Sequence, residues 1–179
     1  MPAPSSQTVV QIIQAAAHEV FTTMLGMEVT CERPPSEAAA FLAPAEGVVS
    51  LVGLTGRWAG TGCVSCSGPL ACRVTSRMLM TPVTAVGEEV LDVMAEVTNM
   101  IIGNVKAGLE EALGPMGLST PTVVYGRNFS TRNVRDGQLS ISRFRLDGEP
   151  LEVKICLAPG LQANPPARHG PCQPEVSQR

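Results

Sequence analysis

The chain has 179 residues, a formal net charge of −3 and 44% hydrophobic residues, which fits one globular domain with a substantial core and excludes disorder of the whole chain. The negative balance gives no reason to expect nucleic acid, because phosphate backbones are bound by clustered Lys and Arg. No apolar run approaches the roughly 20 residues that span a bilayer, and residues 1–7 lack the features of a secretory signal, so we expect a cytoplasmic protein with reduced thiols.

Hydrophobic periodicity and turn residues divide the chain into helical and extended segments. In chain order we predict a helix capped by Ser6 or Thr8 and running to about Leu25, an extended connector over 31–45, strands over 46–55 and 58–67, helices over 69–80 and 87–113, a link over 118–121, and strands over 122–126, 138–146 and 151–158. This order predicts an α/β (α+β) fold with a largely antiparallel sheet and helices packed on it.

The ends of the chain differ from its middle. We expect a flexible leader over residues 1–6, one domain over 7–158 and a Pro-rich flexible tail over 159–179, where periodicity is lost. The last strand of the domain alternates, with Leu151, Val153, Ile155 and Leu157 pointing one way and Glu152, Lys154 and Cys156 the other. This alternation predicts one packed face and one more exposed face.

The segment 87–113 has the clearest helical pattern in the chain. Its apolar residues at 90, 93, 94, 97, 101 and 105 project within roughly 120° of one another and predict a core face. The opposite side carries a polar line whose members lie within about 60° of one another around the helix axis: Asp92, Glu96, Asn99 and Gly103. A glycine inside a helix costs about 1 kcal/mol relative to alanine, and in this polar line we expect it to let another backbone or side chain come close. A solvated face with a tolerated glycine accounts for the same pattern.

The run from Glu96 to Asn104 resembles the signature helix of the CheC/CheX/FliY family, whose members are phosphatases of the phosphorylated chemotaxis response regulator CheY. The family signature is a glutamate and an asparagine three residues apart, here Glu96 and Asn99, with an acidic or hydroxyl residue about one turn upstream, here Asp92. CheC-type members carry this helix twice, whereas this sequence has one copy and is similar to the CheX branch. The specific match covers residues 87–106.

The resemblance implies a CheC-like layered fold and a role for each residue of the polar line. Asn99 would position the attacking water, Glu96 would engage the conserved lysine of the regulator, Asp92 would add a peripheral contact, and Gly103 would keep the approach open. The chemistry fits, because hydrolysis of a phospho-aspartate needs a water held in line with the P–O bond, and a carboxamide both accepts and donates hydrogen bonds.

The resemblance also implies the partners. The substrate would be a phosphorylated CheY-type response regulator, which supplies its own Mg²⁺, so no cofactor is expected in this chain. A homodimer is expected, because members with one motif helix pair and because a small sheet leaves open edges. Two other interpretations stay open: a non-catalytic module that docks on a receiver domain or flagellar switch component, and a purely structural domain.

Cys63 and Cys66 have the spacing of metal ligands, yet a structural zinc site needs a second pair, and His18 and His169 are remote in the sequence. Residues three apart on a strand point to opposite faces, so we predict no metal at this pair. We expect the arginines to be solvated side chains of a loop and hairpin; they are Arg127, Arg132, Arg135, Arg143 and Arg145.

Overall fold

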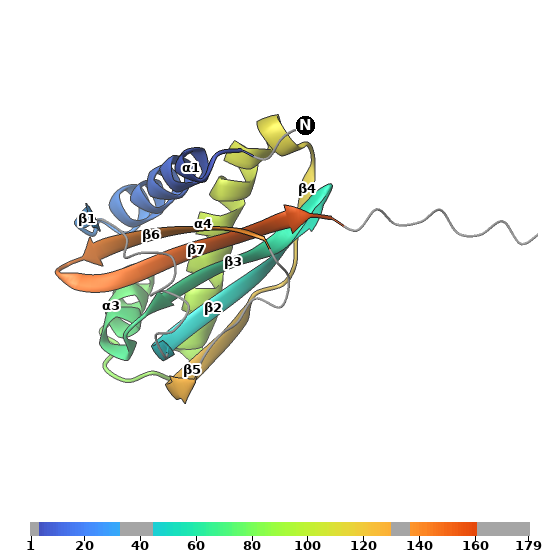
Figure 1. Ribbon diagram of the computed structural model, residues 1–179. Coiled ribbons are helices and arrows are strands. Elements are labelled where there is room, and N and C mark those ends of the chain that lie inside the picture. Colours follow the sequence, from blue (N-terminus) through green and yellow to red (C-terminus); the bar gives the residue numbers. More distant parts are fainter. Residues whose placement is uncertain (1–3, 33–44, 130–136, 161–179) are drawn as a thin grey trace, which may run out of the picture.

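The structure is a computed structural model that describes residues 4–32, 45–129 and 137–160 (Figure 1). The helices are α1 (Ser6–His18), its wider π-helical continuation η1 (Glu19–Met24), α3 (Gly68–Leu79) and α4 (Glu88–Leu113). The strands are β1 (Val29–Glu32), β2 (Ala45–Gly56), β3 (Trp58–Cys66), β4 (Met116–Leu118), β5 (Thr122–Phe129), β6 (Gln138–Leu146) and β7 (Glu149–Pro159). The three predicted helices and the two predicted hairpins are confirmed.

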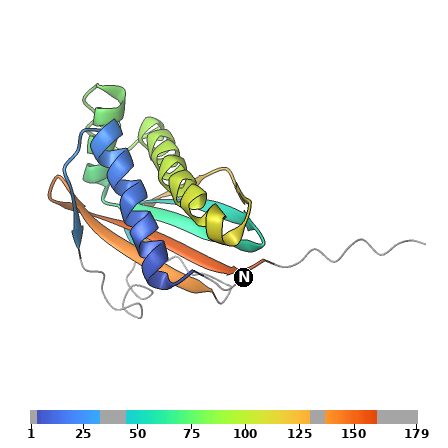
Figure 2. The same cartoon turned by 90° about the horizontal axis from the view of Figure 1, so that it is seen from above.

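The described strands form one seven-stranded sheet in the order β1-β6-β7-β3-β2-β4, with β5 also pairing with β2. Every pairing is antiparallel. Figure 2 shows α1 and α4 side by side over one face of this sheet. The mixed α/β class with a large antiparallel sheet and a long helix packed on it is therefore confirmed.

Two glycines set how closely α4 packs against its neighbours. A Cβ built on Gly62 of β3 would lie 2.7 Å from Cδ1 of Ile102, so this helix rests directly on the backbone of the strand. A Cβ on Gly108 of α4 would lie 2.8 Å from Cγ2 of Ile12, so α1 and α4 meet closely as well. Real Cβ contacts do not reach these distances, and the two positions therefore fix the helix on the sheet and against α1.

Both ends of α4 are held by charge and hydrogen bonding. Glu88 and Glu89 lie in the first turn, where carboxylates complement the positive end of the helix dipole. Near the other end, the Glu110 carboxylate accepts a hydrogen bond from the Met116 backbone N–H at 2.9 Å and pairs with Lys106 at 2.9 Å. These interactions, with the Met116 bond the largest, lower the pKa of Glu110 and tie the end of α4 to β4.

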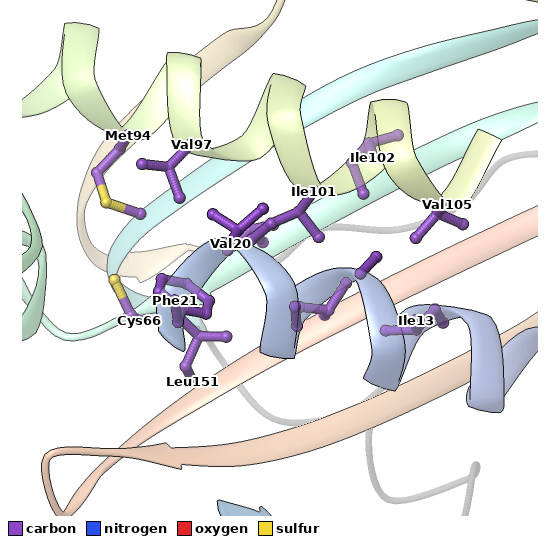
Figure 3. Packing of buried hydrophobic residues seen from close by; sticks show 14 of the residues in the cluster. Ile13, Val20, Phe21, Cys66, Met94, Val97, Ile101, Ile102, Val105 and Leu151 are labelled. Carbon is purple, nitrogen blue, oxygen red and sulfur yellow. The ribbon is translucent and has the colours of Figure 1, made fainter. Parts of the chain in front are cut away.

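The core lies between the sheet and the helices and is almost wholly aliphatic, as the 3% aromatic content predicts. Figure 3 shows side chains of α4 meeting those of α1, η1 and the sheet. Phe21 and Phe144 are its largest fully buried side chains. Ser50 and Ser142 are also buried, and the hydroxyl of each has no hydrogen-bond partner in the part of the chain that the structure describes.

Several local predictions are wrong. Ser5, and not Ser6 or Thr8, caps α1, since its hydroxyl accepts from the Thr8 backbone N–H at 3.1 Å. The predicted leader over 1–6 thus overlaps the start of the fold. Cys31 lies in β1, which pairs with β6, and not in a connector. Residues 33–44 of that connector lie outside the described residues, as does the tail beyond residue 160.

The region after α4 and the last strand also differ from the prediction. Leu118 belongs to the short strand β4, which pairs with the end of β2, and is not part of a link. Cys156, expected on the more exposed face of β7, is only 8% exposed and packs in a small second cluster with Leu139 and Ile141. Alternation placed Cys156 on the correct face, but that face is apolar at this end of the sheet.

Candidate active site

The polar line predicted on α4 lies on the exposed side of the helix. Asp92 and Glu96 are exposed, while Asn99 and Gly103 are half-buried. The opposite side of the helix carries the buried residues Val90, Met94, Val97, Ile101, Val105 and Leu109. Side chains three or four residues apart on a helix are neighbours, with about 5–6 Å between Cβ atoms. The helix therefore presents two carboxylates and a carboxamide together.

The functional groups of this line are free for a partner. Asp92, Glu96 and Asn99 make no hydrogen bond or ion pair with another residue in the part of the chain that the structure describes. The next polar residue, Asn104, is different: its Nδ2 donates to Glu19 of η1 at 3.3 Å. Asn104, on the α1 side of the helix, thus has a partner within the fold, whereas the side chains of the polar line on its solvent side do not have one among the described residues.

Gly103 continues the line, and among the described residues nothing around it requires a glycine. A Cβ at this position would meet only Cδ1 of Leu118, at 3.9 Å, which is an ordinary van der Waals contact. Gly108, in the same helix, is required because of Ile12. Sequence reasoning did not place Leu118 beside this face, because its position depends on the pairing of β4 with the distant end of β2.

The cysteine pair on β3 has the geometry expected of strand residues. Cys66 packs in the core beneath the helices, and Cys63 lies on the other face, opposite Lys154 of β7. Burial raises the pKa of Cys63 to about 11 and that of Cys66 to about 12. Both thiols thus stay protonated at neutral pH. In residues 4–32, 45–129 and 137–160, no three His, Cys, Asp or Glu side chains come together as metal ligands would.

The arginines of the last hairpin pair across strands. Arg143 of β6 bonds Glu152 at 2.7 Å, and Arg145 bonds Glu32 of β1 at 2.6 Å. They lie on the predicted hairpin and link β6 to its two neighbouring strands, β7 and β1. Arg132 and Arg135 fall outside the described residues.

The sequence and the fold match known proteins. Residues 48–145 match the family described as chemotaxis phosphatase CheX. Among solved structures, the chemotaxis protein CheX from Vibrio vulnificus is 25% identical, with a TM-score of 0.74 and coverage of 87% of this chain and 100% of that chain. A chain of the CheX–CheY–BeF₃–Mg²⁺ complex from Borrelia burgdorferi is also 25% identical, with a TM-score of 0.71 and coverage of 83% and 97%.

The more distant Thermotoga maritima FliY, 17% identical with a TM-score of 0.59 over 88% of this chain and 92% of that chain, shares the fold. A comparison with curated proteins gives no match. No helix among the described residues is long and apolar enough to cross a membrane. Because the family match spans more than half of its length, the chain belongs to the CheX family of chemotaxis phosphatases.

The two glycines of α4 make a matched pair of tests. Gly103→Ala should raise the free energy of unfolding by about 0.5–1 kcal/mol, because alanine favours the helix and its methyl group meets Leu118 at an ordinary van der Waals distance. Gly108→Ala should lower the free energy of unfolding by about 1 kcal/mol, because the clash of the new methyl group with Ile12 outweighs the gain in helix propensity. Urea unfolding measures both values. A clear loss of stability in Gly103→Ala would show that this chain's own fold requires the glycine.

Proposed function

We propose that this protein hydrolyses the phospho-aspartate of a CheY-type response regulator with the exposed face of α4. The observation that carries the proposal is the line of Asp92, Glu96 and Asn99, which project from a rigidly packed helix and have no partner among the described residues. Membership of a chemotaxis phosphatase family supports the reaction class. The Borrelia burgdorferi complex, which contains both CheX and CheY, supports a CheY-type partner.

The proposed reaction is the attack of one water on the phosphorus atom. A bond forms between the water oxygen and phosphorus, the bond from phosphorus to the aspartyl oxygen breaks, and the products are inorganic phosphate and the free carboxylate. The acyl phosphate is already reactive, so the barrier is reduced mainly by holding the water in line with the breaking bond. The catalytic apparatus is then shared, and the regulator contributes the phosphoryl group and its bound Mg²⁺.

The residues of α4 would divide this task. The Asn99 carboxamide oxygen accepts a hydrogen bond from the water and its N–H group donates one, which together fix the water's orientation. Glu96, one turn toward the start of the helix, pairs with the regulator's lysine and sets the register of the two proteins. Asp92 makes a further contact at the periphery, and Gly103 lets the regulator's backbone approach. This chain needs no metal of its own, and the reaction belongs in the cytoplasm with the regulator.

Single substitutions at Glu96 and Asn99 separate the two roles. Asn99→Ala should slow dephosphorylation about 100-fold while binding persists, because the water is no longer positioned. Glu96→Ala should weaken both binding and rate, since it removes the contact with the partner. The free energy of unfolding of both variants should lie within about 0.5 kcal/mol of the parent value, as is usual for surface substitutions. The measurements are the decay of a phosphorylated receiver and its binding affinity.

Glu111→Ala is the matched control, because Glu111 is an exposed glutamate of α4 outside the polar line. It should leave the rate and the affinity unchanged. If Asn99→Ala hydrolyses as fast as the parent, the proposed mechanism is wrong. If the parent binds the receiver but releases no phosphate, the protein is a non-catalytic binding module.

We also propose that the protein is a homodimer. Among the described strands, β1 pairs only with β6 and β5 only with β2, so two edges of the sheet have unpaired backbone groups. Open edges of this kind are commonly covered by a second chain. Light scattering at micromolar concentration should give about twice the chain mass of 18.8 kDa, whereas the monomer mass would refute the proposal.

A further inference from the structure

An exposed aromatic residue lies on the same side of the sheet as α4. Tyr125, the single tyrosine of the chain, is 54% exposed on β5. It lies directly opposite Val48 of β2, and Val123 lies opposite Ser50. Val48 belongs to the core beneath the helices, and Ser50, two residues on, shares its face. Since directly opposed residues of antiparallel strands point the same way, Tyr125 and Val123 are on the helix side.

The ring of Tyr125 lies close to the segment that enters α4. A Cβ at Gly68 would lie 3.6 Å from Cε2 of Tyr125 and 3.3 Å from Cγ2 of Val86, two residues before the helix begins. Figure 1 shows the arrowhead of β5 at the end of the molecule where α4 starts. At 1.5 Å per residue, Asp92 and Glu96 follow about 6 and 12 Å along the helix. One molecule can therefore cover the ring and these carboxylates together.

The polar line of α4 is too narrow to be a whole interface. A specific interface covers about 800 Å² on each partner, so contact with the line must extend onto its flanks. On the β-strand side, the flank carries apolar side chains: Leu118 of β4 lies beside Gly103, and Val123 and Tyr125 share the helix side of β5. A tyrosine buries about 150–250 Å² and is among the residues that most often dominate binding energy. Its hydroxyl has no hydrogen-bond partner among the described residues, so it is free to bond a partner.

We infer that Tyr125 is a docking residue for the phosphorylated receiver domain, and that the receiver buries its ring when Glu96 and Asn99 enter the phosphorylation site. This inference rests on the proposed function, because the occupant is the regulator whose phosphoryl group α4 attacks. Tyr125 does not reach the reacting atoms, so its contribution is to affinity and to the choice of partner. Asn99 contributes to the rate, and the two effects are separable.

The test compares Tyr125→Ser with Val124→Ser. Val124 is the adjacent exposed residue of the same strand, 38% exposed, but it lies opposite Val49 and so faces away from α4. Tyr125→Ser should raise KM for the phosphorylated receiver about tenfold with kcat unchanged, as expected when a dominant aromatic contact is lost. Val124→Ser should change neither constant. Tyr125→Phe should keep most of the affinity, since it retains the ring.

Affinity for a Mg²⁺- and BeF₃⁻-loaded receiver, measured by calorimetry, gives a second readout that needs no hydrolysis. If the parent protein releases no phosphate, the proposed function is refuted. If Tyr125→Ser then still binds the loaded receiver more weakly than the parent does, this docking site is supported. Equal KM and equal affinity for the Tyr125→Ser and Val124→Ser variants would overturn the inference. Conversion of a dimer to a monomer by Tyr125→Ser, with receiver affinity unchanged, would assign the ring to a second copy and also overturn it.

Discussion

The contact of Ile102 with the backbone of β3 at Gly62 is the constraint on which the site depends. This contact packs α4 closely on the sheet, and the contact of Gly108 with Ile12 packs the helix closely against α1. Turning the helix by one residue would rotate it by about 100° and remove Asn99 from the exposed side. Burying one Val or Ile side chain stabilises a fold by about 1.5–3 kcal/mol, so the buried face of α4 easily outweighs the cost of its interior glycines.

Because its buried face and its ends hold α4 in place, the exposed face of the helix is not needed to hold it there. The helix ends are held by the first-turn carboxylate of Glu88 and by the ion pair of Lys106 with Glu110. Among the described residues, no hydrogen bond or ion pair involves the side chains of Asp92, Glu96 or Asn99. A site that completes the active centre of another protein needs this property, because its groups must be positioned beforehand yet unpaired. Asn99 is half-buried, and Leu118 beside Gly103 gives the polar line an apolar neighbour on the side of β4.

The parts of the fold that local sequence determines were predictable. The helix over 87–113 and the hairpin of β6 and β7 follow from periodicity and turn residues, and the faces of Glu96 and Asn99 follow from helical geometry alone. β1 and β4 were missed, because three or four residues form a strand only through pairing with β6 and with the end of β2. The orientation of Tyr125 toward α4 depends on the same long-range register, and the roles of Glu96 and Asn99 rest on the family resemblance.

The most direct test of the account is a map of the surface that a receiver covers. Amide chemical shifts of this protein would be recorded with a CheY-type receiver, first unloaded and then loaded with Mg²⁺ and BeF₃⁻ as a mimic of the phosphoryl group. The account predicts that the loaded receiver perturbs the exposed side of α4 from Asp92 to Gly103 and the adjoining part of β5, with much smaller changes for the unloaded receiver. Perturbations centred on the β1 edge or on the sheet face that carries Cys63, with α4 unaffected, would contradict it.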